Sequence, residues 1–140
     1  MAYAKRTKVP ADRTRGEIEK LLKTNGASAF AYASDVGKVM IIFVMNDRRL
    51  RFVVPMPIVN KTGTNERDVA RETARRWRSL LLLVKAKLEA VESKIVGFDE
   101  EFLAHIVIGG ETVGDRWTAE AAELLADPHR KLPPLLGAGT

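Results

Sequence analysis

The spacing of hydrophobic residues changes along the chain, and each change marks the border of a predicted element. Ile18, Leu21 and Leu22 recur at steps of three and four, which predicts a short amphipathic helix. Gly26 favours a helix end just before it, because glycine tolerates the left-handed backbone found at such ends. We therefore expect the first element to be a helix over residues 13–24.

Three strands are predicted between this helix and the next. Residues 27–34 and 49–55 alternate with the period of two of a pleated strand, whereas residues 38–45 are apolar on both faces and predict a central strand. Short turn signals at 35–37 and at 46–47 separate the three segments. The pattern predicts a three-stranded antiparallel meander.

A two-residue loop at Asn46-Asp47 predicts how the second and third strands pair, with Phe43 opposite Leu50. One face of the sheet then becomes a core face, which collects Val39, Ile41, Phe43, Leu50, Phe52 and Val54, together with Ala29, Ala31 and Ala33. The other face carries Phe30, Tyr32, Met40, Ile42, Val44, Arg49, Arg51 and Val53. This second face is too apolar for open water, so we expect something to cover it.

A long helix is predicted from about Asn65 to Lys94. An apolar seam runs along it through Val69, Thr73, Trp77, Leu80, Val84, Leu88, Val91 and Ile95. Leu81, Leu82 and Leu83 widen the apolar surface beyond this seam, so the middle of the helix is predicted to be buried on two sides. The second contact is then either the C-terminal segment or a twin subunit, and the twin subunit would make the protein a homodimer.

The remaining residues predict a smaller extension. It contains a short helix, a hairpin around Gly109-Gly110, an amphipathic helix and a proline-containing tail whose leucines we expect to dock on the body. The predicted fold class is α+β: a three-stranded antiparallel meander packed on one long helix, preceded by a short helix and followed by a small helical and hairpin extension. We expect one domain over residues 13–140, with a core at 13–96 and the extension at 97–140, after a flexible basic arm at 1–12.

Charge is unevenly distributed between the two ends of the chain. The net charge is +5, but residues 1–78 contain 17 Lys or Arg against 8 Asp or Glu, a balance of +9. Residues 79–140 contain 6 Lys or Arg against 10 Asp or Glu, a balance of −4. A basic region of this kind is typical of proteins that attract phosphate backbones, although it can also serve only to keep the chain soluble.

Two features that the sequence lacks exclude certain kinds of site and of partner. The chain has no cysteine, which excludes disulfides, thiolate metal sites and cysteine nucleophiles, and which fits a reducing cytoplasm. The longest apolar run, residues 39–45, is far shorter than the roughly 20 residues of a membrane span, so we expect no membrane partner.

The arginines of the long helix are the strongest candidates for ligand contact. Arg71, Arg75 and Arg78 share one helical face, from which they can contact several phosphates in a salt-sensitive and sequence-tolerant way. The alternative is a set of ion pairs within the helix, because Glu66, Asp68 and Glu72 lie three or four residues from several of the arginines.

A second mode of nucleic-acid contact is suggested by Phe30 and Tyr32 beside Arg49 and Arg51. Aromatic rings on an open sheet stack unpaired bases while neighbouring arginines hold the backbone. The alternative is that these rings belong to a core, which the apolar residues around them favour.

Trp77, Leu81 and Leu82 are candidates for a protein interface, where tryptophan is enriched. Trp77 also lies in the apolar seam, a position that is more often a core anchor.

Signals for catalysis and metal binding are weak. Glu101 and His105 lie four residues apart on one helical face, but no third ligand is evident and His129 is distant in the sequence. The chain has no nucleophile elbow, phosphate-binding loop or dinucleotide-binding glycine pattern. We therefore expect no enzymatic activity, no cofactor and no metal.

Two resemblances add to this interpretation. The order of helix, three strands and helix resembles the double-stranded RNA-binding domain, although TNERDVARE replaces the basic cluster that usually opens the second helix of that domain. The blocks YAKRTKVPADRTRGEIEKLLKTNGA, RRLRFVVPMP, RRWRSLLLLVKAKLEAVESKI, FDEEFLAHIVIGGETVG and PPLL resemble a family of small phage- and prophage-encoded proteins that has no established mechanism. The second resemblance implies a role in the phage programme inside the bacterial cytoplasm, such as genome metabolism or subversion of host defence.

We therefore predict a non-enzymatic phage protein that binds DNA or RNA with little sequence preference. The predicted contact residues are Arg71, Arg75, Arg78, Arg49 and Arg51, with Lys5, Arg6 and Lys8 of the basic arm. The alternative is a phage inhibitor of a host defence complex, of the anti-CRISPR type, that acts by protein binding. Salt-sensitive binding of DNA or RNA would favour the first prediction, and salt-insensitive capture of one protein would favour the second.

Overall fold

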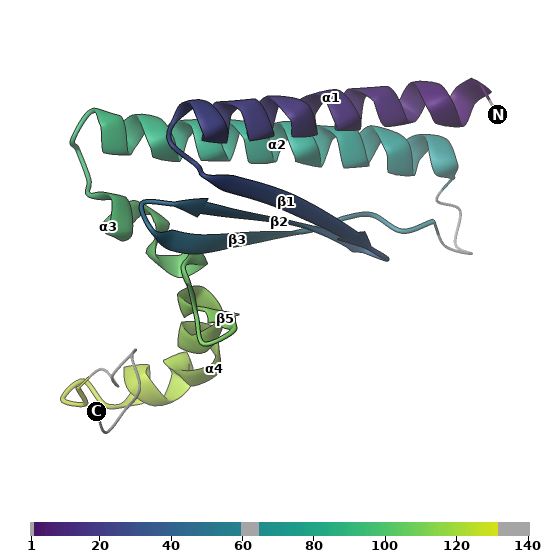
Figure 1. Ribbon diagram of the computed structural model, residues 1–140. Helices are drawn as coiled ribbons and strands as arrows, with labels where there is room; N and C mark the ends of the chain where they lie inside the picture. The colour runs from purple at the N-terminus through teal and green to yellow at the C-terminus, as the bar shows by residue number, and fades with distance from the viewer. Residues whose placement is uncertain (1, 60–64, 132–140) are drawn as a thin grey trace.

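The computed structural model describes residues 2–59 and 65–131, with side chains from Pro10 onward. Its elements, in chain order, are α1 (Ala2–Thr24), β1 (Ala29–Asp35), β2 (Lys38–Met45), β3 (Arg48–Pro55), α2 (Glu66–Glu92), α3 (Phe98–Phe102), the 3-10 helix η1 (Leu103–His105), β4 (Val107–Ile108), β5 (Glu111–Thr112) and α4 (Val113–Ala126). The helices α1 and α2 lie side by side on one face of the sheet β1-β2-β3, as Figure 1 shows. The predicted α+β fold class is confirmed.

The helix α1 begins earlier than the sequence predicts. It starts at Ala2, so it includes residues 2–12 of the segment that we expected to be a flexible arm. Pro10 lies inside the helix, where it removes one backbone donor, and Thr14 Oγ1 donates a hydrogen bond of 3.0 Å to its carbonyl. Our prediction began the helix after this proline, at residue 13, but one missing donor does not prevent a helix when helix-forming residues continue on both sides.

The pairing of β2 with β3 confirms the predicted register. Phe43 lies opposite Leu50. Asn46 and Asp47 form the connecting loop with φ angles of 51° and 60°, the positive values of a tight hairpin turn whose twist matches that of the strands.

The pairing of β1 with β2 differs from the prediction by one residue. Asp35 pairs with Lys38 across a two-residue turn, and Phe30 therefore lies opposite Phe43, whereas the prediction placed Asp35 inside the turn. Because side chains alternate along a strand, this shift moves every side chain of β1 to the other face. Phe30 and Tyr32 share the face that the helices cover, and the three alanines of β1 share the opposite one.

The core fills the space between the two helices and the sheet. Its buried hydrophobic side chains are Ile18, Leu22, Val39, Ile41, Phe43, Met45, Leu50, Phe52, Trp77, Leu80, Val84, Leu88, Phe102 and Ile106. The predicted seam of α2 is therefore confirmed from Trp77 to Leu88. The prediction that the seam extends to Ile95 is wrong, because α2 stops at Glu92 and Ile95 is 83% exposed.

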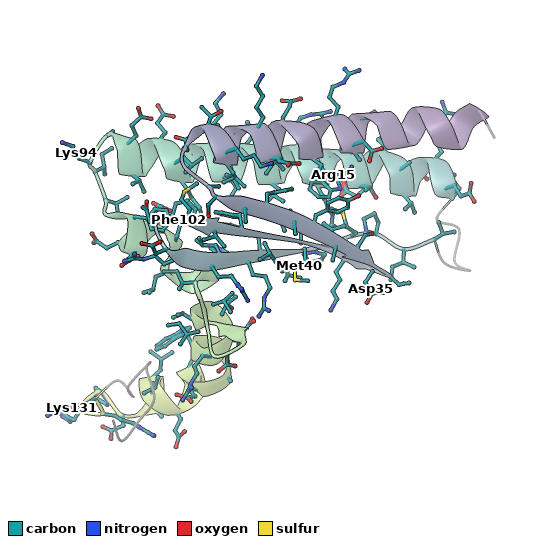
Figure 2. The ribbon with its side chains drawn as sticks, in the orientation of Figure 1. Arg15, Asp35, Met40, Lys94, Phe102 and Lys131 are labelled. Atoms are coloured by element: carbon teal, nitrogen blue, oxygen red, sulfur yellow. The ribbon has the colours of Figure 1, made fainter. Side chains whose placement is uncertain are left out.

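Of the described elements, only the start of the C-terminal extension touches the opposite face of the sheet, which α1 and α2 leave uncovered (Figure 1). We call it the open sheet face, and its members are Ala29, Ala31, Ala33, Met40, Ile42, Val44, Arg49, Arg51 and Val53. Figure 2 shows Met40 projecting from the sheet on the side away from α1 and α2. Within the described residues, the expectation that something covers this face is met only near Arg51, which contacts the C-terminal hairpin.

The C-terminal extension is attached to the β3 edge of the sheet. Phe102 is fully buried, and its ring meets the ring of Phe52 edge-on, with centroids 6.4 Å apart. Leu50 and Ile106 form an antiparallel bridge. The predicted hairpin around Gly109-Gly110 is confirmed as β4 and β5.

The helix α4 follows this hairpin directly and leads away from the sheet (Figure 1). Thr112 caps it, since its side-chain oxygen accepts a hydrogen bond of 3.0 Å from the backbone N–H of Asp115. No residue of α4 is buried. The predicted docking of the C-terminal tail concerns residues 132–140, which lie outside the described residues.

Candidate nucleic-acid interface

The two long helices bring basic regions of the chain together. They run in the same direction, so their N-terminal halves lie at one end of the helical layer (Figure 1). Residues 2–15 contain five basic and one acidic residue, and residues 66–78 contain five and three, which together give a balance of +6. The C-terminal halves, residues 16–24 and 79–92, each contain two basic and two acidic residues and balance to zero. The positive charge of the helical layer is therefore concentrated at one end.

Arg71 and Arg78 are two accessible cations in the N-terminal half of α2. Both side chains are exposed, and neither forms an ion pair with another described residue. They lie on one side of the helix, about 10 Å apart along its axis at 1.5 Å per residue. A guanidinium that no carboxylate neutralises keeps its five N–H donors for a ligand.

Glu72 binds two neighbouring arginines, which supports the ion-pair alternative for part of the cluster. Arg75 donates two hydrogen bonds to its carboxylate, one of them 2.8 Å long, and Arg76 Nε donates another of 3.2 Å. The hydrogen bond from Arg75 is the largest cause that lowers the pKa of Glu72 to about 2. Arg76 also donates a hydrogen bond of 2.7 Å to the carbonyl of Pro55 and so ties α2 to the end of β3. Arg75, by contrast, remains 64% exposed and can meet a ligand.

Arg13 is a further exposed cation, in the N-terminal half of the neighbouring helix α1. Its side chain is exposed and forms no ion pair with another described residue. Arg15 serves the fold instead, since it pairs with Asp12 at 2.9 Å and lies over the ring of Tyr32, 4.0 Å from the centroid. We call Arg13, Arg71, Arg75 and Arg78 the basic helix surface.

Arg13 was not among the predicted contact residues, because the basic residues before it were assigned to a flexible arm at 1–12. A helix that continues through Pro10 would have joined Arg13 to those residues in one basic helix. The predicted contact residues Lys5, Arg6 and Lys8 lie on the backbone of α1 at the same end. Their side chains lie outside the described part of the structure.

Arg49 and Arg51 lie on the other side of the molecule, on the open sheet face. Arg49 is exposed and has no ion pair with a described residue. Arg51 donates a hydrogen bond of 3.2 Å to the carbonyl of Gly110 and lies 3.9 Å from a carboxylate oxygen of Asp115. Arg51 therefore holds the C-terminal extension to the sheet, and the five predicted arginines do not form one surface.

The predicted base-stacking residues do not lie beside these arginines. Phe30 is half-buried against the core, and Tyr32 is 48% exposed with Arg15 over its ring. Both project from the helix-covered face, so the predicted platform of two aromatic rings and two arginines is wrong. The cause is the one-residue register shift between β1 and β2.

The three candidates for a protein interface have different positions. Trp77 is only 4% exposed, so it is a core anchor and cannot lead an interface in this fold. Leu81 packs against the core, whereas Leu82 is 60% exposed and its neighbour Leu83 is 46% exposed. Leu82 is the only one of the three candidates that stays accessible to a partner.

The candidate metal pair has other partners. Glu101 accepts a hydrogen bond of 2.9 Å from Lys87 Nζ, and the ring of His105 stacks on Phe52. Burial and the charge of Lys87 lower the pKa of His105. Among the residues described, no group of three or more His, Cys, Asp or Glu is arranged to hold a metal ion.

Comparison with known proteins gives no relative for this chain: no family model, no curated protein and no solved structure matches it. None of the described helices combines the length and the apolar character that a bilayer span requires.

Proposed function

We propose that the protein binds DNA or RNA through the basic helix surface, inside a bacterial cell during a phage programme. The observation that carries the proposal is the parallel packing of α1 and α2, which places ten basic residues in the N-terminal halves of two adjacent helices. The aligned helix dipoles add partial positive charge at the same end. Arg71 and Arg78 supply guanidinium groups that no described carboxylate neutralises.

Such a surface binds charge rather than sequence. Contacts from exposed arginines to phosphate oxygens carry no information about the bases. Duplex DNA carries one charge per roughly 1.7 Å of axis, so a row of about 10 Å meets several phosphates. The affinity is therefore expected to depend weakly on sequence and to fall steeply with salt.

Fluorescence anisotropy with labelled single- and double-stranded DNA and RNA tests the proposal. The wild type is compared with Arg71→Ala, Arg78→Ala at salt concentrations of about 50 and 200 mM. The matched control is Lys20→Ala, Lys85→Ala, which removes the same charge from exposed positions in the C-terminal halves of the same two helices.

The arginine variant is expected to lose most of the binding at low salt, and the lysine variant is expected to keep it. Equal losses in the two variants would show that net charge alone is responsible, and the proposed surface would be wrong. Absence of binding to all four nucleic acids at the lower salt concentration would reject the function itself.

The open sheet face favours a second candidate function, the binding of a host protein such as a component of a defence complex. Met40, Ile42 and Val44 follow each other on this face of β2 and are only partly shielded, and Val53 is 52% exposed. An apolar sheet face without a covering element is typical of a protein interaction site. A stoichiometric, salt-insensitive complex that Ile42→Glu abolishes would support this candidate, provided that circular dichroism shows the variant to be folded.

A homodimer is a further form of protein binding that the exposed Leu82 and Leu83 favour. Sedimentation velocity of the wild type and of Leu82→Glu, Leu83→Glu distinguishes it from a monomer. A wild type that sediments as a monomer at all concentrations would reject it.

A further inference from the structure

An apolar groove separates α4 from α3 and η1. It has a volume of about 500 Å³, and its apolar lining consists of Leu103, Ala104, Val113, Gly114, Trp117 and Leu124. We call it the α4 groove. Trp117 and Leu103 are 43% and 44% exposed, so large apolar side chains line a hollow that no described element fills. It lies in the C-terminal extension, apart from the basic helix surface.

The groove is a built feature of the fold, since both of its walls are fixed. Gly114 allows α4 to approach η1 so closely that a Cβ at this position would lie 2.8 Å from the carbonyl oxygen of Ala104. On the other wall, Lys87 Nζ donates hydrogen bonds of 3.0 and 2.9 Å to the backbone carbonyl and side chain of Glu101. These contacts fix the positions of α4 and of α3 with η1, so the groove between them stays open.

The surroundings of the groove are acidic. Residues 97–127 contain eight Asp or Glu and only one basic residue, Arg116. Glu100, Glu101 and Glu120 lie in the wall of the groove, where Lys87 pairs with Glu101 and Arg116 pairs with Glu120. Glu100 has no ion pair with a described residue, and Glu123 follows on the next turn of α4. The chemistry of the groove thus suits an apolar segment that is preceded by positive charge.

The chain itself contains such a segment directly after α4. Arg130 and Lys131 precede the sequence LPPLL at residues 132–136, which lie outside the described part of the structure. Arg130 Nη1 lies 2.9 Å from Glu123 Oε1, and its backbone N–H donates a hydrogen bond of 3.1 Å to the carbonyl of Asp127. These contacts turn the chain back beside the last turns of α4, close to the groove.

We propose that the α4 groove binds residues 132–136 of the same chain. Two adjacent prolines favour an extended conformation with about 3.1 Å per residue, so five residues cover about 15 Å. Trp117 and Leu124, seven residues apart on α4, are separated by about 10 Å along the axis. The leucines then contact the apolar lining, and the proline rings lie against Trp117 in the way that proline-rich segments bind aromatic grooves.

Proline also lowers the cost of this binding. It has no backbone N–H that burial would leave without a partner, and its fixed φ leaves little conformational freedom to lose. The basic pair at positions 130 and 131 directs the segment towards the acidic side of α4, where Arg130 already meets Glu123.

The absence of cysteine permits a direct test in the full-length chain. Leu124→Cys with Leu135→Cys places one thiol in the groove and one in the segment. The matched control, Leu125→Cys with Leu135→Cys, moves the first thiol by one residue to a side chain of α4 that is 73% exposed and does not line the groove. Under the same mild oxidation, we expect the groove pair to form an intramolecular disulfide at least about tenfold faster, because docking raises the effective concentration of the second thiol. Equal rates, or a disulfide-linked dimer as the main product, would overturn the proposal.

A second readout uses the fluorescence of Trp117. Trp77, at 4% exposure, contributes a shielded background. In Leu135→Ser, Leu136→Ser we expect a red-shifted emission and stronger acrylamide quenching, whereas Leu125→Ser, at a position 73% exposed, leaves both unchanged. An unchanged spectrum in the double variant would contradict binding in the groove. Nucleic-acid binding does not enter either readout, so this proposal and the proposed function can fail separately.

Discussion

The imidazole of His105 stacks on the ring of Phe52, with 3.8 Å between the ring centroids and 12° between the planes. Phe52 belongs to the core face of β3, and His105 ends the 3-10 helix that follows α3. The contact therefore joins the C-terminal extension to the sheet. Burial, the largest cause, and the charge of Lys87 both lower the pKa of His105.

This contact makes stability depend on pH below neutrality. An unfolded histidine has a pKa of about 6.5, so the unfolded chain takes up the proton of His105 before the folded chain does. The contribution of the neutral ring is complete above about pH 6.5 and is lost as the pH falls towards the lowered folded-state pKa.

Urea unfolding between about pH 5 and 8 checks this expectation. The free energy of unfolding of the wild type should decrease below about pH 6.5, and His105→Gln should flatten that decrease. His129→Gln, which changes the exposed histidine, is the control and should behave like the wild type. A decrease of the same slope in His105→Gln and in the wild type would contradict the assignment.

The space around Gly114 and Gly16 predicts opposite effects on stability for substitution of these two glycines by alanine. In Gly114→Ala the new Cβ would lie 2.8 Å from a backbone oxygen, so we expect a loss of about 1–3 kcal/mol in the free energy of unfolding or a local release of α4. Gly16→Ala in α1 meets no atom within 4 Å and should stabilise the protein by about 0.5–1 kcal/mol. Chemical denaturation measures both, and hydrogen exchange of α4 reveals local release. A Gly114→Ala variant as stable as the wild type, with α4 still protected, would show that the approach is not tight.

Local sequence patterns predicted the fold well where the residues of a turn allow only one backbone geometry. Asn46 and Asp47 are short polar residues that tolerate positive φ, so the loop length and the β2–β3 register could be predicted from the sequence. Asp35 fits a turn and a strand end equally well, so the β1–β2 register could not be predicted from the sequence. The direction in which α1 and α2 pack is a tertiary property, and no local pattern indicates it.

The corrected register of β1 predicts unequal effects at neighbouring positions. Phe30 is half-buried against the core, so Phe30→Ala should lower the free energy of unfolding by about 2 kcal/mol. Ala31 lies exposed on the open sheet face, so Ala31→Lys should change it by less than about 0.5 kcal/mol. Thermal and urea unfolding of the two variants provide the measurement. The register that the sequence suggested requires the reverse, a tolerated Phe30→Ala and a severe Ala31→Lys.

The candidate site was predictable as a set of residues but not as a surface. Arg71 and Arg78 could be recognised from helical spacing alone, because their exposure follows from the position of the apolar seam. The separation of Arg49 from them follows from the predicted core face, which is confirmed, with Ile41 and Phe43 buried and Ile42 left on the open side. The parallel packing of α1 beside α2 could not be predicted in this way, because it is a property of the tertiary structure.

That separation predicts different salt dependences for two sets of arginine variants. Each phosphate contact contributes about 0.9 to the slope of log K against log salt, so Arg71→Ala, Arg78→Ala should reduce the slope by about 1.8. Arg49→Ala, on the opposite side of the sheet, should leave the slope unchanged and the affinity within about twofold. Anisotropy titrations of one duplex at four or more salt concentrations give both slopes. If Arg49→Ala weakened binding as much as the helix variant, the nucleic acid would contact the open sheet face, and the basic helix surface would not be the site.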